Sequence, residues 1–222
     1  MAIDKDHAAR TALRLLDADG LEKLTVRRLA GELGVQAPAL YWHFANKRAL
    51  LDHMTDAMLA PAAARLGRPR PGQAWWEWLG DTLEALRRAL LAHRDGAAVA
   101  SGADLRRAVA LGLHAERVTE VLYESGFALA DASRAAGAVL HFTVGRVVEE
   151  QSRADAGTEQ AMIADPAFPF PLLARSLRER HAAAATPDDD FGYALAIVLA
   201  GLRTLHPDAT ATTAPRPRES RP

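Results

Sequence analysis

The sequence contains no cysteine, which excludes disulfide bonds and thiolate metal sites and suits a reducing compartment. No apolar run approaches the roughly 18 residues that a membrane-spanning helix needs. The N-terminal segment MAIDKDHAARTALRLLDADG lacks the apolar stretch of a secretory signal. These absences predict a cytoplasmic protein without membrane contact.

Motifs for catalysis are also missing. The chain has no HExxH, GxSxG, Walker or dinucleotide-binding glycine pattern. We therefore expect no catalytic residue, no metal ligand and no cofactor, and we do not expect an enzyme.

The chain has no large excess of charge of either sign, because 27 Lys and Arg nearly balance 28 Asp and Glu. The formal net charge is −1. A nucleic-acid partner therefore has to be argued locally. Between Lys23 and Arg48 five cations stand against one anion, Glu32, so this window carries +4. A basic module on a slightly acidic body is typical of a DNA reader, although chance clustering on a solvated face is the alternative.

Apolar spacing predicts an all-α fold, because alanine is abundant, β-branched residues are few and no long stretch alternates with period two. The expected helices cover about 6–18, 25–33, 36–43, 47–64, 74–93, 97–102, 105–124, 129–152, 172–184 and 188–205. Thr25 and Asn46 are expected to cap two of them. A Pro/Gly linker at 65–73 divides a helix-turn-helix domain, 1–64, from a larger domain, 74–205. Residues 153–171 are predicted to form a mobile loop, and 206–222 a disordered tail.

The segment 24–54 holds the most informative pattern. Two short helices joined at Gly34 form a helix-turn-helix. Leu40 and Phe44 share the inner stripe of the second helix. A helix this short cannot bury every side, so some of Pro38, Tyr41, Trp42 and His43 must face outward. Exposed aromatic groups beside cations suit thymine methyls and phosphates. The alternative is that this aromatic pair is core or seals the linker.

These residues support a family resemblance. From Thr25 to Leu51, which includes YWHFANKRALLD, the chain resembles the DNA-binding domain of the TetR family, and the tetracycline-repressor subfamily in particular. The segments ALLAHRDGA (89–97) and LHFTVGRVVEEQ (140–151) resemble that subfamily's C-terminal domain.

The resemblance implies residue roles in DNA binding. The positions that match DNA contacts in the family are Arg27, Ala37, Pro38, Tyr41, Trp42, His43 and Lys47. Family members usually carry glutamine where this chain has Ala37, and the neighbouring Gln36 is the substitute we expect to read a base. The operator should therefore differ from the tetracycline operator.

The resemblance also implies a homodimer, with helices 129–152 and 188–205 pairing with their mates in a four-helix bundle. The first of these helices is apolar on several sides, as burial against more than one partner requires. Two reading helices would then lie about 34–36 Å apart, on a palindromic operator.

A small-molecule inducer is implied as well, but not the magnesium chelate of tetracycline. Ala100 stands where the subfamily has its metal-binding histidine, and Thr82 and Leu86 replace an asparagine and a phenylalanine. We expect a largely apolar inducer with one or two polar groups, met by Thr82 or His141. The candidate pocket residues are Thr82, Leu86, Leu90, Val99, Ala100, Leu113, Val118, Val139, His141 and Phe142. The alternative is that these residues are ordinary core.

Together these features predict a repressor released when a ligand shifts helix 97–102 against helix 47–64. The alternatives are a helical adaptor that binds protein and an enzyme acting in the C-terminal cavity. His93 is expected to cap a helix end. The other histidines outside the two candidate sites are expected at the surface: His7, His53, His114, His181 and His206.

Overall fold

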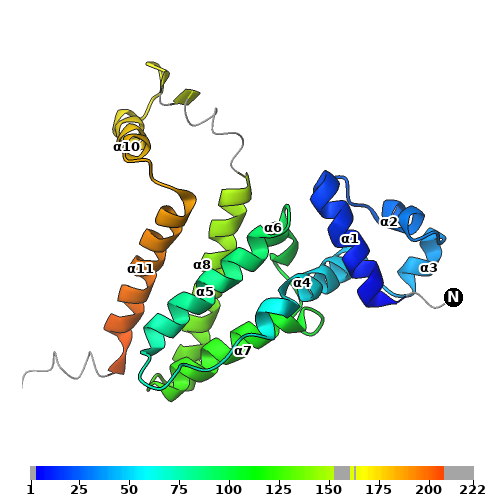
Figure 1. The fold of residues 1–222 in the computed structure, drawn as a ribbon, viewed down its shortest axis with the longest axis horizontal. Helices are drawn as coiled ribbons and strands as arrows, with labels where there is room; N and C mark the ends of the chain where they lie inside the picture. The colour runs from blue at the N-terminus through cyan, green and yellow to red at the C-terminus, as the bar shows by residue number, and fades with distance from the viewer. Residues whose placement is uncertain (1–3, 153–160, 163, 208–222) are drawn as a thin grey trace, which may run out of the picture.

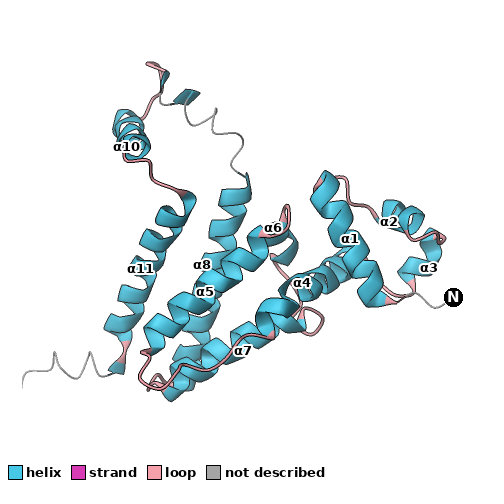
Figure 2. Cartoon of the chain, in the orientation of Figure 1, coloured by secondary structure: helices cyan, strands magenta, loops and turns pink. Residues whose placement is uncertain are grey.

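The computed structural model describes residues 4–152, 161–162 and 164–207. Within these ranges the chain forms helices and loops and no strand, as the all-α expectation requires (Figures 1 and 2). The helices are α1 Lys5–Asp19, α2 Val26–Glu32, α3 Ala37–Tyr41, α4 Lys47–Ala63, α5 Trp75–Leu91, α6 Gly96–Ala100, α7 Val109–Glu124, α8 Leu129–Ser152, α10 Pro171–Ala182 and α11 Pro187–Leu205.

Helices α1 to α3 form a small N-terminal head against the start of α4 (Figure 1). The two predicted caps are present: Oγ1 of Thr25 accepts from the Arg28 amide at 3.1 Å, and Oδ1 of Asn46 accepts from the Ala49 amide at 2.9 Å. Leu16, Leu29 and Leu40 are fully buried between these helices. The head thus holds its own apolar centre.

Helix α4 joins the head to the body. It packs against α1 in the head and against α5, α6 and α7 in the body. One continuous apolar cluster includes Leu29 in the head, Met58 in α4 and Leu83 in the body. Core packing therefore crosses the molecule through α4, and the division into domains at the 65–73 linker stays a prediction.

The body is built on α5, α7 and α8, and α11 packs against α5 and α8. Figure 1 places α11 on the side of the molecule opposite the head, with α10 beyond its N-terminal end. The ends of α8 and α11 agree closely with the predicted ranges 129–152 and 188–205. None of the described helices is long and apolar enough to cross a membrane.

The start of α7 differs from the predicted range, and two other predicted segments are described only in part or not at all. Helix α7 begins at Val109 instead of about 105, because Arg107 and Ala108 donate to the Asp104 carbonyl at 2.9 Å in a separate turn. Much of the predicted 153–171 loop, and all of the predicted tail beyond 207, lie outside the described residues.

Candidate functional site

The outer face of the head carries the residues predicted to contact DNA. Tyr41 is 53% exposed and Trp42 is 89% exposed, so neither is core and neither seals the linker. Arg27, Gln36, Pro38 and Lys47 are also exposed, whereas Ala37 and His43 are half-buried. The structure therefore brings the predicted residues to one small module and leaves most of them open to solvent.

The local packing explains this outward face. Leu40 is fully buried and Phe44 is 2% exposed, and the Phe44 ring meets His53 edge-on at 5.4 Å. The Phe44 amide donates to the Leu40 carbonyl at 2.8 Å, which continues the helical turn beyond α3. Once these two side chains occupy the inner stripe, the 3.6-residue period directs Tyr41 and Trp42 away from it.

The head also carries exposed cations. In the described part of the chain no carboxylate lies within ion-pair distance of Arg27 or Lys47, whereas Arg28 pairs with Asp19. Guanidinium and ammonium groups without an internal anion are suited to phosphate oxygens. The face thus offers apolar edges and positive charge together.

Near the start of α4, a buried carboxylate links this helix to the body through hydrogen bonds. Asp52 is fully buried; its Oδ1 accepts from Nε of Arg48 at 2.8 Å and its Oδ2 from Nε of Arg107 at 3.0 Å. The Asp104 amide adds a third donor at 3.2 Å. Two cations and an amide compensate the charge, as a buried carboxylate requires.

Arg48 also holds the end of α6. Its guanidinium donates to the carbonyls of Val99 at 2.7 Å and Ser101 at 2.9 Å. These carbonyls lie at the C-terminal end of α6, where the helix dipole favours a cation. We call Arg48, Asp52, Arg107 and their partners in α6 and the α6–α7 turn the α4 clamp. It was not anticipated from the sequence.

A second set of contacts ties the HRDG loop to α1. Nδ1 of His93 lies 2.9 Å from the Asp17 carboxylate, and the Arg94 amide donates to the same carboxylate at 3.1 Å. Asp95 accepts from the Leu21 amide at 2.7 Å. His93 therefore contacts the head, in place of the helix-capping role expected for it.

The predicted inducer residues are not gathered around one described cavity. Five of them are fully buried: Leu86, Leu90, Val99, Val118 and Val139. Ala100 is 2% exposed and Thr82 6%, whereas Leu113 is 51% exposed on α7. His141 is exposed, and Phe142 stacks on Phe191 at 5.9 Å. Their assignment to an inducer pocket stays a prediction.

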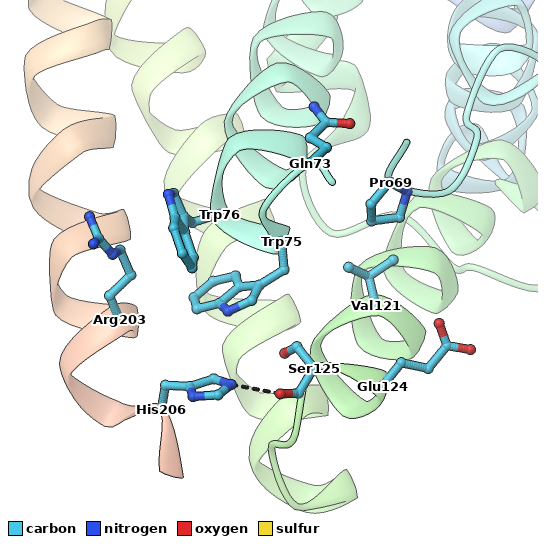
Figure 3. Close-up of a pocket in the computed structure, with 9 residues that line it drawn as sticks. All are labelled: Pro69, Gln73, Trp75, Trp76, Val121, Glu124, Ser125, Arg203 and His206. Atoms are coloured by element: carbon cyan, nitrogen blue, oxygen red, sulfur yellow. Dashed lines mark hydrogen bonds between the residues drawn. The ribbon is translucent and has the colours of Figure 1, made fainter. Parts of the chain in front are cut away.

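Two cavities in the described structure are of similar size. The first, about 640 Å³, lies at the α11 C-terminus and is lined by Trp75, Trp76, Arg203 and His206 (Figure 3). The second, about 630 Å³, lies between α4, the linker, α5 and α7, and Thr82 is the predicted inducer residue that lines it. We call this second cavity the α4 cavity.

Three histidines are not fully at the surface, contrary to expectation. His53 is half-buried and packs edge-on against the Phe44 ring. His114 is 1% exposed because α7 turns it inward, where Nδ1 lies 2.8 Å from the Ala110 carbonyl. His206 is half-buried between Trp75 and Phe127, with Nε2 2.7 Å from the Ser125 carbonyl. Sequence spacing could have indicated His114, since it lies four residues after Ala110 and four before Val118 on the buried stripe.

The Ala100 side chain has no atom that can bind a metal ion. Exclusion of a magnesium chelate stays a prediction.

Comparison with known proteins covers nearly the whole chain. A family model described as bacterial regulatory proteins, tetR family, matches residues 9–54. A second, described as tetracyclin repressor-like, C-terminal domain, matches 68–206. The chain is 40% identical over 207 residues to the class C tetracycline repressor protein of Escherichia coli, covering 91% of this chain and 92% of that protein.

Solved structures give the same result. A TetR variant from Acinetobacter baumannii AYE in complex with minocycline is 32% identical, with a TM-score of 0.74 over 99% of this chain and all of that one. BioQ of Mycobacterium smegmatis, solved with its natural double-stranded DNA operator, is 34% identical with a TM-score of 0.59, covering 82% of this chain and 99% of that one.

Proposed function

The chain belongs to the TetR family of bacterial transcriptional regulators, and we propose that it is a homodimeric repressor that binds a palindromic operator through α3 and is released by an inducer other than magnesium-bound tetracycline. The observation that carries the DNA-binding role is the exposure of Tyr41 and Trp42 on a head whose other large apolar side chains are buried or partly buried. Its relatives are regulators, which favours neither an adaptor nor an enzyme.

We propose that α3 enters the major groove, with Gln36 and Ala37 at its start and Tyr41 and Trp42 at its end. The short apolar groups Ala37 and Pro38 suit thymine methyls, and the Tyr41 hydroxyl and Lys47 suit phosphates. Helix α2 presents Arg27 to the neighbouring backbone. The absence of glutamine at position 37 supports an operator that differs from those of the tetracycline repressors.

The proposed dimer is supported by an apolar face on α11. Tyr193 is 75% exposed, Ile197 59% and Leu205 68%, and all lie on the outer side of that helix. Small residues on α8, including Ala138 and Gly145, are exposed as well and would permit close helix packing. Large apolar side chains grouped on one helix are typical of an oligomer interface.

Release from DNA requires the inducer site to be coupled to the head, and α4 provides the connection. Met58 lines the α4 cavity, and a Cβ added to Gly96 would lie 3.0 Å from the Met58 sulfur and 2.3 Å from the Leu90 carbonyl. Because Gly96 opens α6 and the α4 clamp holds its other end, we propose that ligand entry shifts α6 and α4 together. The inducer must favour the non-binding state by several kcal/mol.

The alanine at position 100, which carries no ligand atom, supports exclusion of the drug chelate. Titration with tetracycline and Mg²⁺, followed by drug fluorescence, is expected to show no saturable binding at micromolar concentrations. Micromolar affinity would overturn this part of the proposal.

Selection of bound duplexes from random DNA, followed by gel-shift assays, tests the function. We expect an inverted repeat whose affinity falls with salt at a log–log slope of about −0.9 for each phosphate contacted. Failure to enrich any motif, or an affinity independent of salt, would contradict a sequence-reading regulator.

A further inference from the structure

The α4 cavity has the size and the construction of a ligand site. Its volume, about 630 Å³, lies within the range of small-molecule pockets, about 300–1,000 Å³. Its floor is buried and mostly apolar, formed by Met58 and Trp78, which are 5% and 6% exposed. Such a floor favours an apolar ring or chain.

Two buried polar side chains complete the floor. Thr82 is 6% exposed and His114 1%. Burial lowers the pKa of His114, so the ring is neutral at physiological pH. Because the Ala110 carbonyl can only accept, the proton resides on Nδ1, which leaves Nε2 as an acceptor for a ligand hydroxyl.

The rim of the cavity is strongly cationic. Four arginines line it, Arg65, Arg68, Arg70 and Arg88, against one acid, Asp81. Arg68 is paired with Glu120 and Glu124, and Arg88 lies 3.5 Å from Glu84; none of these glutamates lines the cavity.

The other two arginines remain uncompensated. Over the described ranges, neither Arg65 nor Arg70 has a carboxylate within 4.0 Å. The Asp81 carboxylate already accepts a hydrogen bond from the side-chain amide of Gln73 at 3.0 Å. Two guanidinium groups at the mouth of an apolar cavity are suited to a carboxylate or sulfonate group.

We propose that the α4 cavity binds an amphipathic anion, whose apolar body lies on Met58 and Trp78 and whose acidic group is held by Arg65 and Arg70. This inference deepens the proposed function, on which it rests, by giving the inducer a chemical class. Such a ligand contacts α4 directly, since Met58 and Arg65 lie at its C-terminal end and just beyond it.

The cavity at the α11 C-terminus is a weaker candidate. It contains two tryptophans, but Arg203 already lies over the Trp76 ring at 4.5 Å, and His206 is held by the Ser125 carbonyl (Figure 3). No residue of α4 lines it. It therefore provides a control for the experiment.

A pair of dyes tests the proposal. 1-Anilinonaphthalene-8-sulfonate is an anion with an apolar ring system. N-phenyl-1-naphthylamine is the same ring system without the sulfonate. Both are titrated by fluorescence into the full chain and into R65Q, R70Q and the double variant R65Q/R70Q. The control is R203Q, which removes one arginine from the other cavity.

We expect the sulfonate dye to bind R65Q and R70Q several-fold more weakly than it binds the wild type. Its affinity for the double variant should fall by about tenfold or more. Binding of the uncharged dye should not change, which also shows that the cavity is intact. R203Q should behave as the wild type with both dyes.

Equal sulfonate affinity in all variants, a loss confined to R203Q, or equal weakening of both dyes would each overturn the proposal. The readout is independent of DNA. Failure to bind any operator would remove the regulator assignment and leave the dye result unaffected, so the two failures are distinguishable.

Discussion

At the scale of single residues, the proposed DNA reading depends on where a few side chains point. Tyr41 and Trp42 are exposed because Leu40 and Phe44 occupy the inner stripe of a very short helix. This arrangement follows from helical periodicity and from the small size of the head. It could therefore be predicted from the sequence, and the structure confirms it.

We expect Y41A and K47A each to weaken operator binding about tenfold, since single phosphate or base contacts contribute about 1–3 kcal/mol. K47A should also reduce the salt slope by about one. Gel-shift titration measures both effects. The control is Y123A on α7, where Tyr123 is 54% exposed, close to the 53% of Tyr41; an equal loss in Y123A would contradict the assignment.

His114 makes stability depend on pH. Burial lowers its pKa in the folded chain below the ordinary value of 6.5, so the unfolded chain binds more protons as pH falls through that value. The stabilisation is complete above about pH 6.5 and is lost below it.

Urea unfolding at pH 7.5 and 5.5 measures this dependence. The wild type should lose more free energy of unfolding between these pH values than H114Q, in which the titrating group is absent. H181Q serves as the control because His181 is exposed. An identical loss in the wild type and H114Q would show that His114 does not contribute.

At the scale of elements, the caps at Thr25 and Asn46 and the ranges of α8 and α11 follow from local signals. The α4 clamp does not, because its partners lie about fifty residues apart in the sequence. One local sign was present: Asp52 interrupts the apolar stripe of α4 four residues after Arg48. The inward turn of His114 and the cationic rim of the α4 cavity likewise depend on packing between helices.

We expect D52N to destabilise the fold by about 2–3 kcal/mol, because an amide offers one acceptor oxygen where two arginines need two. Urea unfolding gives the value. The matched control is D131N, whose carboxylate is 60% exposed and pairs with Arg134 at 2.8 Å; it should change stability by less than about 0.5 kcal/mol. Equal effects of the two substitutions would argue against a clamp.

At the scale of the whole molecule, the operator can be read only if two heads are held at a fixed spacing. The exposed apolar face of α11 was not anticipated from the sequence, and the pairing of this helix with its mate was expected only from the family resemblance. The buried and exposed stripes of α11 are now distinct: Phe191 and Leu195 face the body, whereas Tyr193 and Ile197 do not.

I197R should weaken the dimer by about 100-fold or more, because it places a charge at the centre of the proposed interface. Sedimentation equilibrium across a range of concentrations measures the dissociation constant. Y123R, a charge on the exposed face of α7, is the control. A dimer unaffected by I197R would place the interface elsewhere.

Repression requires two α3 faces to read one duplex together. Binding to the selected inverted repeat is therefore compared with binding to the same repeat carrying about 5 extra base pairs, half a helical turn, at its centre. Two chains should bind the original duplex, and the insertion should lower the affinity about 100-fold or more. Unchanged affinity, or one chain bound to each duplex, would show that the two faces do not act together.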